Sequence, residues 1–421
     1  MPGSWQLAQG GELTSGGTMD KQRGGYFSCV VASSFALLLG CQPAELIEAG
    51  DGTVSGSAPA VSVRNGQALA SWHRGAGQVH VSAYHGSGWS VPLTIGTGRF
   101  PDIAVSNGDA AVALFANGSV LQVAERATSG WLPAHALDTV TALSYGVTIE
   151  GGGRASAVWS GSGQVKASIQ EGSGWGGATV LGDHASFGNP QIATNDSGVL
   201  FAAWCGPSNR IWAARRVSPG SWEPRVSSST NCCQGPALDT PGPGVGLGVS
   251  ATGVAVIVGS TAARVCELRY KPGSGWQSTG VLGTPGADAT TPSVAVNADG
   301  HALVAWNNFT AGGGLIQVRV YDPLAATWGP LLTGPATGTG RLGVGLGSTG
   351  YGAVVYRGAG SIRYLTYSAG ALSAPGVVAS AADTLYYLKL GFDPNVEAQG
   401  VSIWQRTGVG AENIWAARLG L

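Results

Sequence analysis

Charged residues are scarce in this chain of 421 residues. Asp, Glu, Lys and Arg make up 11% of the sequence, with 22 Lys and Arg against 23 Asp and Glu, whereas an ordinary domain has about 25%. This near balance provides neither the basic face that nucleic acid requires nor a polybasic patch for anionic lipid. We therefore expect no nucleic-acid partner.

Glycine, in contrast, is abundant, with 70 residues. The glycines follow no strict three-residue period, which excludes a collagen-like chain. A glycine inside a helix costs about 1 kcal/mol, which disfavours a helical bundle. Hydrophobic residues make up 44% of the chain, too many for intrinsic disorder. An all-β fold with short strands and many tight turns remains.

The N-terminal segment has the features of an export signal. A short basic stretch precedes an apolar run from Tyr26 to Leu39. That run is shorter than the roughly 20 residues of a membrane-spanning helix and has the length of a signal-peptide core. It ends in Leu38-Leu39-Gly40-Cys41, which resembles the lipobox of bacterial lipoproteins.

This resemblance implies three segments. Residues 1–18 are a non-native N-terminal extension before a start at Met19, residues 19–40 are a lipoprotein signal peptide, and residues 41–421 form the mature domain. Cys41 would carry the lipid, and the Gln42 that follows favours the outer over the inner membrane of a bacterial cell envelope. The alternative is a buried N-terminal helix with an incidental cysteine.

One pattern repeats along the rest of the chain. A tryptophan follows a small-residue turn such as Gly-Ser-Gly at intervals of 42 to 54 residues. These tryptophans are Trp89, Trp131, Trp175, Trp222, Trp276 and Trp328. A second series ends apolar runs such as Ala-Leu-Val-Ala-Trp. Its eight members are Trp72, Phe115, Trp159, Trp204, Val258, Trp306, Tyr356 and Trp404.

Each repeat is interpreted as four short strands, which is the pattern of a β-propeller blade. The second series predicts a single propeller of eight blades, with seven as the alternative if the glycine-rich unit around 236–285 is irregular. The last unit lacks a fourth strand. We expect residues 43–48 to supply it and close the ring, which removes exposed sheet edges. Buried aromatics that fill the wedges between blades are the preferred role of the tryptophans, and a ring of exposed, sugar-binding aromatics is the alternative.

Four cysteines of the expected propeller fall near one crossover between blades. They are Cys205, Cys232, Cys233 and Cys266. In an exported protein such cysteines predict disulfides. The preferred arrangement links the adjacent pair to both neighbours, one partner being Cys205 and the other Cys266. A bridge between Cys232 and Cys233, or free buried thiols, are the alternatives. No histidine lies nearby, so we expect no metal site.

The tryptophan turns are similar to the Asp-box repeats of sialidases, Ser-x-Asp-x-Gly-x-Thr-Trp, but lack the Asp. Sialidase chemistry also requires an arginine cluster for the substrate carboxylate, a nucleophilic Tyr and acid/base carboxylates. Six arginines fall near the loop-rich face of the expected propeller and are the candidate ligand-binding residues. They are Arg74, Arg99, Arg264, Arg341, Arg357 and Arg406. No motif makes them a catalytic triad.

The sequence lacks the other catalytic signatures of propellers and hydrolases. The combination of eight blades and an adjacent cysteine pair is similar to that of pyrroloquinoline-quinone dehydrogenases. The tryptophan-docking repeat of that family is missing from this sequence, so we expect no cofactor. The sequence contains no Gly-x-Ser-x-Gly elbow and no phosphate-binding loop. We identify no catalytic residue.

Two hypotheses for function remain. The first is an envelope-anchored binding module whose glycan or protein partner docks on the loop-rich face. The second is a carbohydrate-active enzyme, sialidase-like or lyase-like, that uses the same face. We expect a monomer that contacts the membrane only through its N-terminal lipid.

Overall fold

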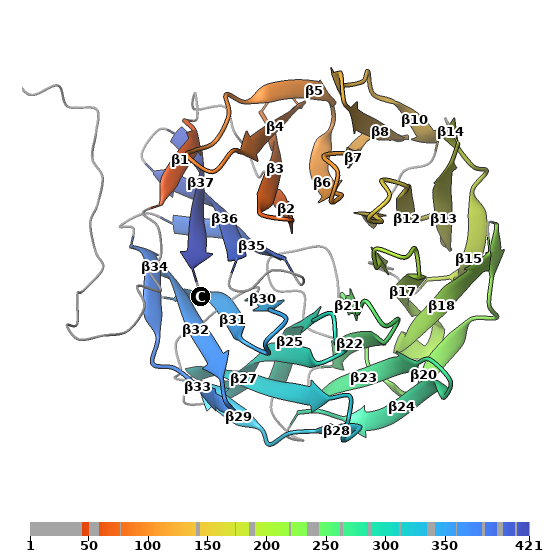
Figure 1. Cartoon of the computed structure of the whole chain (residues 1–421), viewed down its shortest axis with the longest axis vertical. Helices are drawn as coiled ribbons and strands as arrows, with labels where there is room; N and C mark the ends of the chain where they lie inside the picture. Colours follow the sequence, from red (N-terminus) through yellow and green to blue (C-terminus); the bar gives the residue numbers. More distant parts are fainter. Residues whose placement is uncertain are drawn as a thin grey trace, which may run out of the picture.

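The computed structural model is a ring of eight antiparallel β-sheets (Figure 1). It describes residues 44–49, 59–75, 77–139, 144–172, 174–184, 190–218, 220–233, 244–261, 264–283, 288–310, 313–334, 342–358, 360–380, 384–393, 399–408 and 411–420. Each sheet is one blade, with its first strand nearest the ring centre and its fourth on the rim. The expected all-β propeller of eight blades is confirmed, and the seven-bladed alternative is wrong.

The first four blades follow one another from residue 60. Blade 1 contains β2 (Ala60–Arg64), β3 (Gln67–Arg74), β4 (Gln78–Tyr84) and β5 (Leu93–Thr97). Blade 2 contains β6 (Arg99–Val105), β7 (Ala111–Asn117), β8 (Val120–Ala127), β9 (Gly130–Trp131) and β10 (His135–Asp138). Blade 3 contains β11 (Ser144–Ile149), β12 (Ala155–Gly161), β13 (Gln164–Glu171), β14 (Gly174–Trp175) and β15 (Thr179–Asp183). Blade 4 contains β16 (Gln191–Thr194), β17 (Leu200–Gly206), the 3₁₀ turn η1 (Pro207–Asn209), β18 (Arg210–Ser218), β19 (Ser221–Trp222) and β20 (Val226–Asn231).

The other four blades complete the ring. Blade 5 contains β21 (Gly246–Val249), β22 (Ala255–Thr261), β23 (Arg264–Lys271) and β24 (Gly275–Val281). Blade 6 contains β25 (Asp288–Val296), β26 (Ala302–Thr310), β27 (Gly313–Asp322), β28 (Thr327–Trp328) and β29 (Leu332–Gly334). Blade 7 contains β30 (Leu342–Leu346), β31 (Gly352–Gly358), β32 (Ser361–Ser368), β33 (Ala371–Leu372) and β34 (Gly376–Ser380). Blade 8 contains β35 (Thr384–Phe392), β36 (Gln399–Gly408), β37 (Ala411–Gly420) and β1 (Glu45–Glu48).

The ring is closed by the N-terminal strand. β1 pairs antiparallel with β37, with Glu45 opposite Ala416 and Leu46 opposite Trp415. Figure 1 shows these two strands side by side although they come from opposite ends of the chain. The expected closing strand is confirmed, and it spans Glu45–Glu48.

The second-strand aromatics form the core between blades. All eight members of the series that runs from Trp72 to Trp404 are at most 1% exposed. Several indoles also tie neighbouring blades together. Trp159 Nε1 donates to the Asp138 carboxylate of the preceding blade at 2.9 Å, and Trp204 Nε1 donates to the Asp183 carbonyl at 3.0 Å. The preferred role of these residues, filling the wedges, is confirmed.

Glycine has a role at the ring centre that the repeat pattern did not reveal. In β30, Gly343 and Gly345 face the first strand of blade 8. A Cβ on Gly343 would lie 2.4 Å from the Leu390 Cβ, well inside van der Waals contact. Alternating glycines therefore allow the innermost strands of neighbouring blades to approach closely. Other glycines form the turns.

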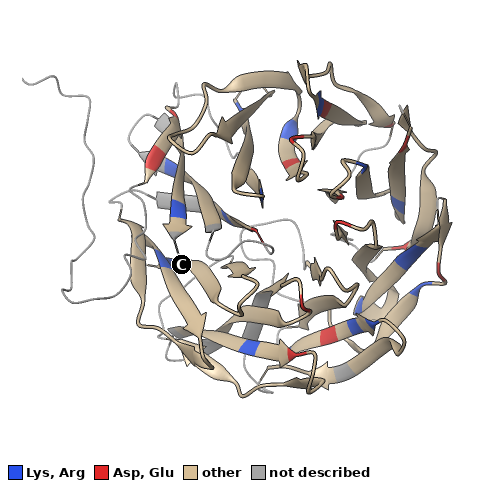
Figure 2. Cartoon of the chain, viewed as in Figure 1, with Lys and Arg blue, Asp and Glu red and all other residues tan. Residues whose placement is uncertain are grey.

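Because successive strands are antiparallel, each second strand ends on the face of the ring where each first strand begins. We call this the loop-rich face and the opposite one the turn face. Figure 2 shows both charge signs spread thinly over the blades rather than gathered on one of them. The described residues include no helix long and apolar enough to cross a membrane.

Candidate functional site on the loop-rich face

The connection from blade 1 to blade 2 is very short. β5 ends at Thr97 and β6 begins at Arg99, so Gly98 alone joins them. The Gly98 N–H donates to the Gly77 carbonyl at 2.5 Å. A Cβ on Gly98 would lie 2.6 Å from the Phe115 ring and 2.8 Å from the Ala116 carbonyl oxygen. This close packing determines where the next residues emerge on the loop-rich face.

Phe100 is held here in an unusual conformation. Its φ is +53°, in the left-handed region, which costs a bulky residue of order 1–3 kcal/mol. Its side chain is nevertheless 52% exposed. Among the side chains that the structure describes, Phe100 is the one exposed aromatic. A strained backbone that presents an apolar ring to solvent is a feature that packing alone does not explain.

Two neighbouring side chains hold Phe100 in place. Its N–H donates to His73 Nδ1 at 3.3 Å, and the two rings meet edge to face with centroids 5.3 Å apart. Its carbonyl accepts from the Tyr145 hydroxyl at 2.8 Å. His73 belongs to blade 1 and Tyr145 to blade 3. Side chains from the blades on either side therefore hold both the N–H and the carbonyl of Phe100.

The Tyr145 hydroxyl is fully engaged. It also accepts from the Ala116 N–H at 3.1 Å and lies 2.8 Å from the Arg99 carbonyl. Burial raises the pKa of Tyr145 well above its ordinary value, and the nearby Asp102 carboxylate raises it further. Tyr145 therefore remains protonated at physiological pH and acts as a hydrogen-bond donor.

Asp102 lies deeper, along the same strand as Phe100. Its carboxylate accepts from the Val147 N–H of the next innermost strand at 3.1 Å. Burial raises the pKa of Asp102, while Lys389 opposes that shift by favouring the charged form. Lys389 lies on β35 of blade 8. Charges from blades 2 and 8 thus interact across the innermost strand of blade 1.

On the turn face, a second set of polar side chains spans the centre of the ring. Arg64 Nε donates to Asn107 Oδ1 at 3.1 Å, and the Arg64 guanidinium pairs with the Asp196 carboxylate. Asn107 Nδ2 donates to that same carboxylate at 3.1 Å. Arg64 ends β2 of blade 1, and Asn107 and Asp196 lie in the turns that follow β6 of blade 2 and β16 of blade 4. The centre of the turn face is therefore occupied by side chains that link non-adjacent blades.

The candidate arginines are distributed over several blades. Arg74 ends β3 and pairs with Glu48 at 3.1 Å. The Arg406 guanidinium lies 5.7 Å from the Trp415 ring centroid within blade 8.

Arg99 and Arg264 are exposed at the start of β6 and β23. Arg357 is half-buried near the end of β31, and Arg341 lies outside the described residues. Of these six, Arg99 is adjacent to Phe100.

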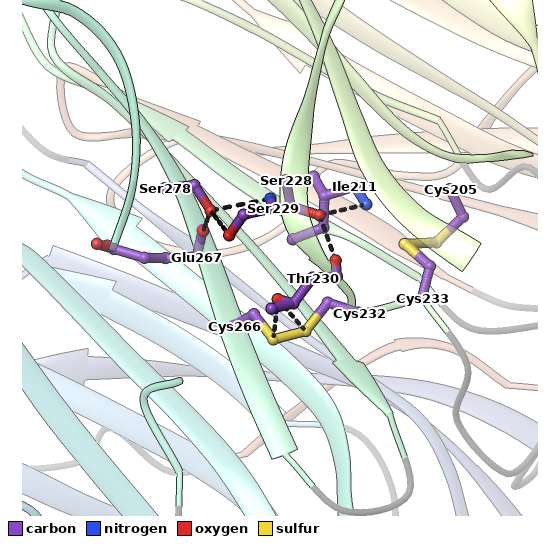
Figure 3. The surroundings of a disulfide bond; sticks show 10 residues. All are labelled: Cys205, Ile211, Ser228, Ser229, Thr230, Cys232, Cys233, Cys266, Glu267 and Ser278. Atoms are coloured by element: carbon purple, nitrogen blue, oxygen red, sulfur yellow. Dashed lines mark hydrogen bonds between the residues drawn. A yellow bond between two sulfur atoms is a disulfide. The ribbon is translucent and has the colours of Figure 1, made fainter. Parts of the chain in front are cut away.

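The cysteines form two disulfides at the crossover from blade 4 to blade 5. They are Cys205–Cys233 and Cys232–Cys266 (Figure 3). The N–H groups of Cys232 and Cys233 both donate to the Asn209 carbonyl, at 2.7 and 2.9 Å. The preferred arrangement is confirmed, and the alternatives of a Cys232–Cys233 bridge and of free thiols are wrong. Cys41 lies outside the described residues.

The tryptophans that follow the small-residue turns are half-buried. Trp175 Nε1 donates to the Glu125 carboxylate of blade 2 at 3.0 Å, and Trp328 Nε1 donates to Glu267 of blade 5 at 2.9 Å. These indoles therefore fasten the outer part of one blade to the preceding one. Phe100, the exposed aromatic among the described side chains, belongs to neither tryptophan series, so the repeat pattern gave no signal for it.

Comparison with known proteins gives similarity of fold. No protein-family model and no curated protein match the sequence. Among solved structures, an ulvan lyase of polysaccharide lyase family PL25, bound to -[GlcA(1-4)Rha3S]-, has a TM-score of 0.50 at 12% identity, covering 89% of this chain and 95% of its own. A variant of the Aleuria aurantia lectin in complex with Fucα1-6GlcNAc has a TM-score of 0.43 at 12% identity, with coverages of 77% and 95%. A protein from Lactobacillus plantarum has a TM-score of 0.48 at 13% identity, with coverages of 75% and 96%. At these identities the likeness to the lyase supports the propeller fold alone.

Proposed function

We propose that this chain is a carbohydrate-binding propeller whose ligand stacks on Phe100 at the loop-rich face. The observation that carries the proposal is the Phe100 ring, which is 52% exposed on a left-handed backbone. An apolar ring face is suited to packing against the C–H face of a sugar, and a ring held rigidly loses little entropy on binding.

The surroundings of Phe100 support this use. The exposed Arg99 precedes it, and Asn117 ends the neighbouring strand β7 beside Ala116, which is paired with Arg99. Guanidinium and amide groups donate hydrogen bonds, and the amide oxygen accepts them, as sugar hydroxyls require. An aromatic platform flanked by polar groups of this kind fits a glycan better than a purely apolar ligand.

The second candidate function is a lyase-like enzyme, because the ulvan lyase named above shares the propeller fold. The titratable groups next to Phe100 include Tyr145, Asp102 and His73, whose Nδ1 already accepts the Phe100 N–H. The raised pKa of Tyr145 and its three backbone contacts suit a positioning role better than proton abstraction. We therefore favour binding without turnover.

A glycan array and a panel of polysaccharides test both functions. We expect the purified protein to bind a subset of glycans and to release no unsaturated product. Phe100→Ala should abolish the array signal, whereas Val281→Ala, which removes an exposed apolar side chain from blade 5, should leave it unchanged. A signal that survives Phe100→Ala would contradict the proposal. Turnover that is lost in Tyr145→Phe would favour the lyase, and capture of a protein without glycan binding would favour a protein partner.

We further propose that the propeller is held at the bacterial cell envelope by lipid on Cys41. The lipobox-like sequence Leu38-Leu39-Gly40-Cys41 supports this, as do the two disulfides, which suit an oxidising compartment. Intact-mass measurement of the membrane fraction tests it. We expect a chain that begins at Cys41 and carries a diacylglyceryl group, and an unmodified, uncleaved chain would contradict the proposal.

A further inference from the structure

Arg99 is an exposed arginine that no carboxylate neutralises. It begins β6, and among the residues that the structure describes its guanidinium makes no ion pair and no hydrogen bond. Other arginines of the ring are paired, Arg74 with Glu48 and Arg215 with Glu223. In a chain with only 11% charged residues, an unpaired cation beside an exposed aromatic is a feature that points to a ligand.

The strands around Phe100 carry almost no negative charge. β3, β5, β6, β7 and β11 contain one carboxylate between them, that of Asp102. It accepts from the Val147 N–H at 3.1 Å, and burial raises the pKa of Asp102 against the opposing effect of Lys389. Asp138, at the end of β10, pairs with Lys166 at 3.2 Å. The positive charge of Arg99 therefore remains available to a bound molecule.

The backbone holds Arg99 beside the Phe100 ring. Consecutive Cα atoms are about 3.8 Å apart across a trans peptide bond. The Arg99 carbonyl lies 2.8 Å from the Tyr145 hydroxyl, and the Phe100 N–H donates to His73 Nδ1 at 3.3 Å. Both sides of the peptide group that joins the two residues are thus fixed. A guanidinium on this long side chain can reach a substituent at the edge of a sugar ring that is stacked on Phe100.

Arg264 has the same charge without the aromatic ring. It begins β23 on the loop-rich face of blade 5, is exposed, and among the described residues also makes no ion pair or hydrogen bond. The residue that follows it, Val265, is fully buried, whereas the residue that follows Arg99 is the exposed Phe100. Arg264 is therefore a matched control for any effect of charge alone.

We propose that the glycan bound at Phe100 is acidic, with a carboxylate or sulfate group that pairs with Arg99. This inference rests on the proposed carbohydrate-binding function and names the class of its ligand. A planar guanidinium donates two parallel hydrogen bonds to an oxyanion, and such charge-assisted bonds are about twice as strong as neutral ones. Uronic acids and sulfated sugars offer both an apolar C–H face for the Phe100 ring and an anion for Arg99.

Matched acidic and neutral probes test the charge requirement. Oligosaccharides of polygalacturonate and alginate are compared with their methyl esters, and sulfated dextran is compared with unsulfated dextran. Calorimetric titration measures each affinity. We expect the wild type to bind the acidic member of at least one pair about tenfold more tightly than its neutral partner. The pair that responds tells whether the anion is a carboxylate or a sulfate. High salt should narrow the difference, because salt screens exposed charges.

A pair of arginine variants connects this preference with the Phe100 site. Arg99→Gln should lower the affinity for the acidic probe about tenfold, to that of its neutral partner. Arg264→Gln removes an equally exposed charge from the same face and should bind as the wild type does. Neither side chain has a partner among the described residues, so both variants should keep the fold, and a melting curve checks this.

The outcomes distinguish the acidic ligand from the binding function. Glycan binding that is lost in Phe100→Ala but shows no preference for any acidic member would overturn the acidic ligand and leave the binding function intact. An equal loss in Arg99→Gln and Arg264→Gln, or no loss in either, would also overturn it. A protein that binds neither acidic nor neutral glycans would overturn the binding function, and the acidic ligand with it.

Discussion

Glu48 of the N-terminal strand accepts a hydrogen bond from the indole of Trp72, the first member of the buried aromatic series. The same carboxylate pairs with Arg74 at 3.1 Å. One side chain of a four-residue strand thus satisfies two groups of blade 1 while the backbone of that strand completes blade 8. Closure of the ring depends on this carboxylate as well as on strand pairing.

Replacement of Glu48 should weaken the closure. Glu48→Ala leaves the Trp72 N–H and the Arg74 guanidinium without this partner, and we expect the free energy of unfolding to fall by about 2–4 kcal/mol. Chemical denaturation measures the change. Glu45→Ala, on the same strand, is the control and should cost less than about 0.5 kcal/mol. Deletion of 42–50 should have a larger effect than Glu48→Ala. Equal stability of the wild type and Glu48→Ala would refute this role.

Stability should also depend on pH through His80. Burial lowers the pKa of His80 from its ordinary value, and Arg74 lowers it further, while Glu48 opposes the shift. A folded-state pKa below the unfolded value means that the unfolded chain takes up the proton first as pH falls. The contribution of His80 is therefore present above about pH 6.5 and is lost as pH falls below that value. Melting temperatures at pH 8 and pH 5 should differ more in the wild type than in His80→Gln, and an identical difference would exclude His80 as the cause.

The backbone of Phe100 predicts an inverted order of stability. At an ordinary strand position, glycine is less stable than alanine by about 0.5–1 kcal/mol. At a φ of +53° the order should reverse, so Phe100→Gly should be more stable than Phe100→Ala by about 1 kcal/mol. Both variants should weaken glycan binding at least tenfold. The usual order of stability would show that Phe100 is not strained in solution.

The two disulfides should each stabilise the crossover between blades 4 and 5. Their sequence separations are 28 and 34 residues, for which loop-closure entropy predicts about 3–4 kcal/mol each. Cys205→Ala with Cys233→Ala should lower the free energy of unfolding by about that amount, as should Cys232→Ala with Cys266→Ala. Only the second pair also links the last strand of blade 4 to blade 5. A change below 1 kcal/mol in both double variants would show that packing alone holds the crossover.

The fold was predictable because its signals recur locally. Most blades repeat an apolar strand that ends in an aromatic, followed by a small-residue turn and a tryptophan, so the boundaries of one repeat help to locate those of the others. The last repeat has three recognisable strands, and the apolar segment before residue 50 supplied the candidate for its fourth. The position of Cys232 and Cys233 between two blades favoured the observed disulfide pairs over a Cys232–Cys233 bridge or free thiols.

The candidate site was not predictable in the same way. Phe100 is exposed because His73 of blade 1 and Tyr145 of blade 3 hold it, and these contacts depend on how three blades pack. Arg64 and Asp196 meet only because the ring has a particular radius. The alternating glycines near Gly343 and Gly345 did carry a signal, since glycine at every second strand position marks a close approach of another backbone.

The pairing of β1 with β37 sets an order of events during synthesis. β1 is made first among the described strands, and β37 is made last. The N-terminal strand therefore has no partner until almost the whole propeller has left the ribosome, and any interruption of synthesis leaves a polypeptide with an unfinished eighth sheet. Among the described strands, this pairing joins the segment made first to the segment made last, so a chain interrupted before β37 would leave β1 without its partner strand.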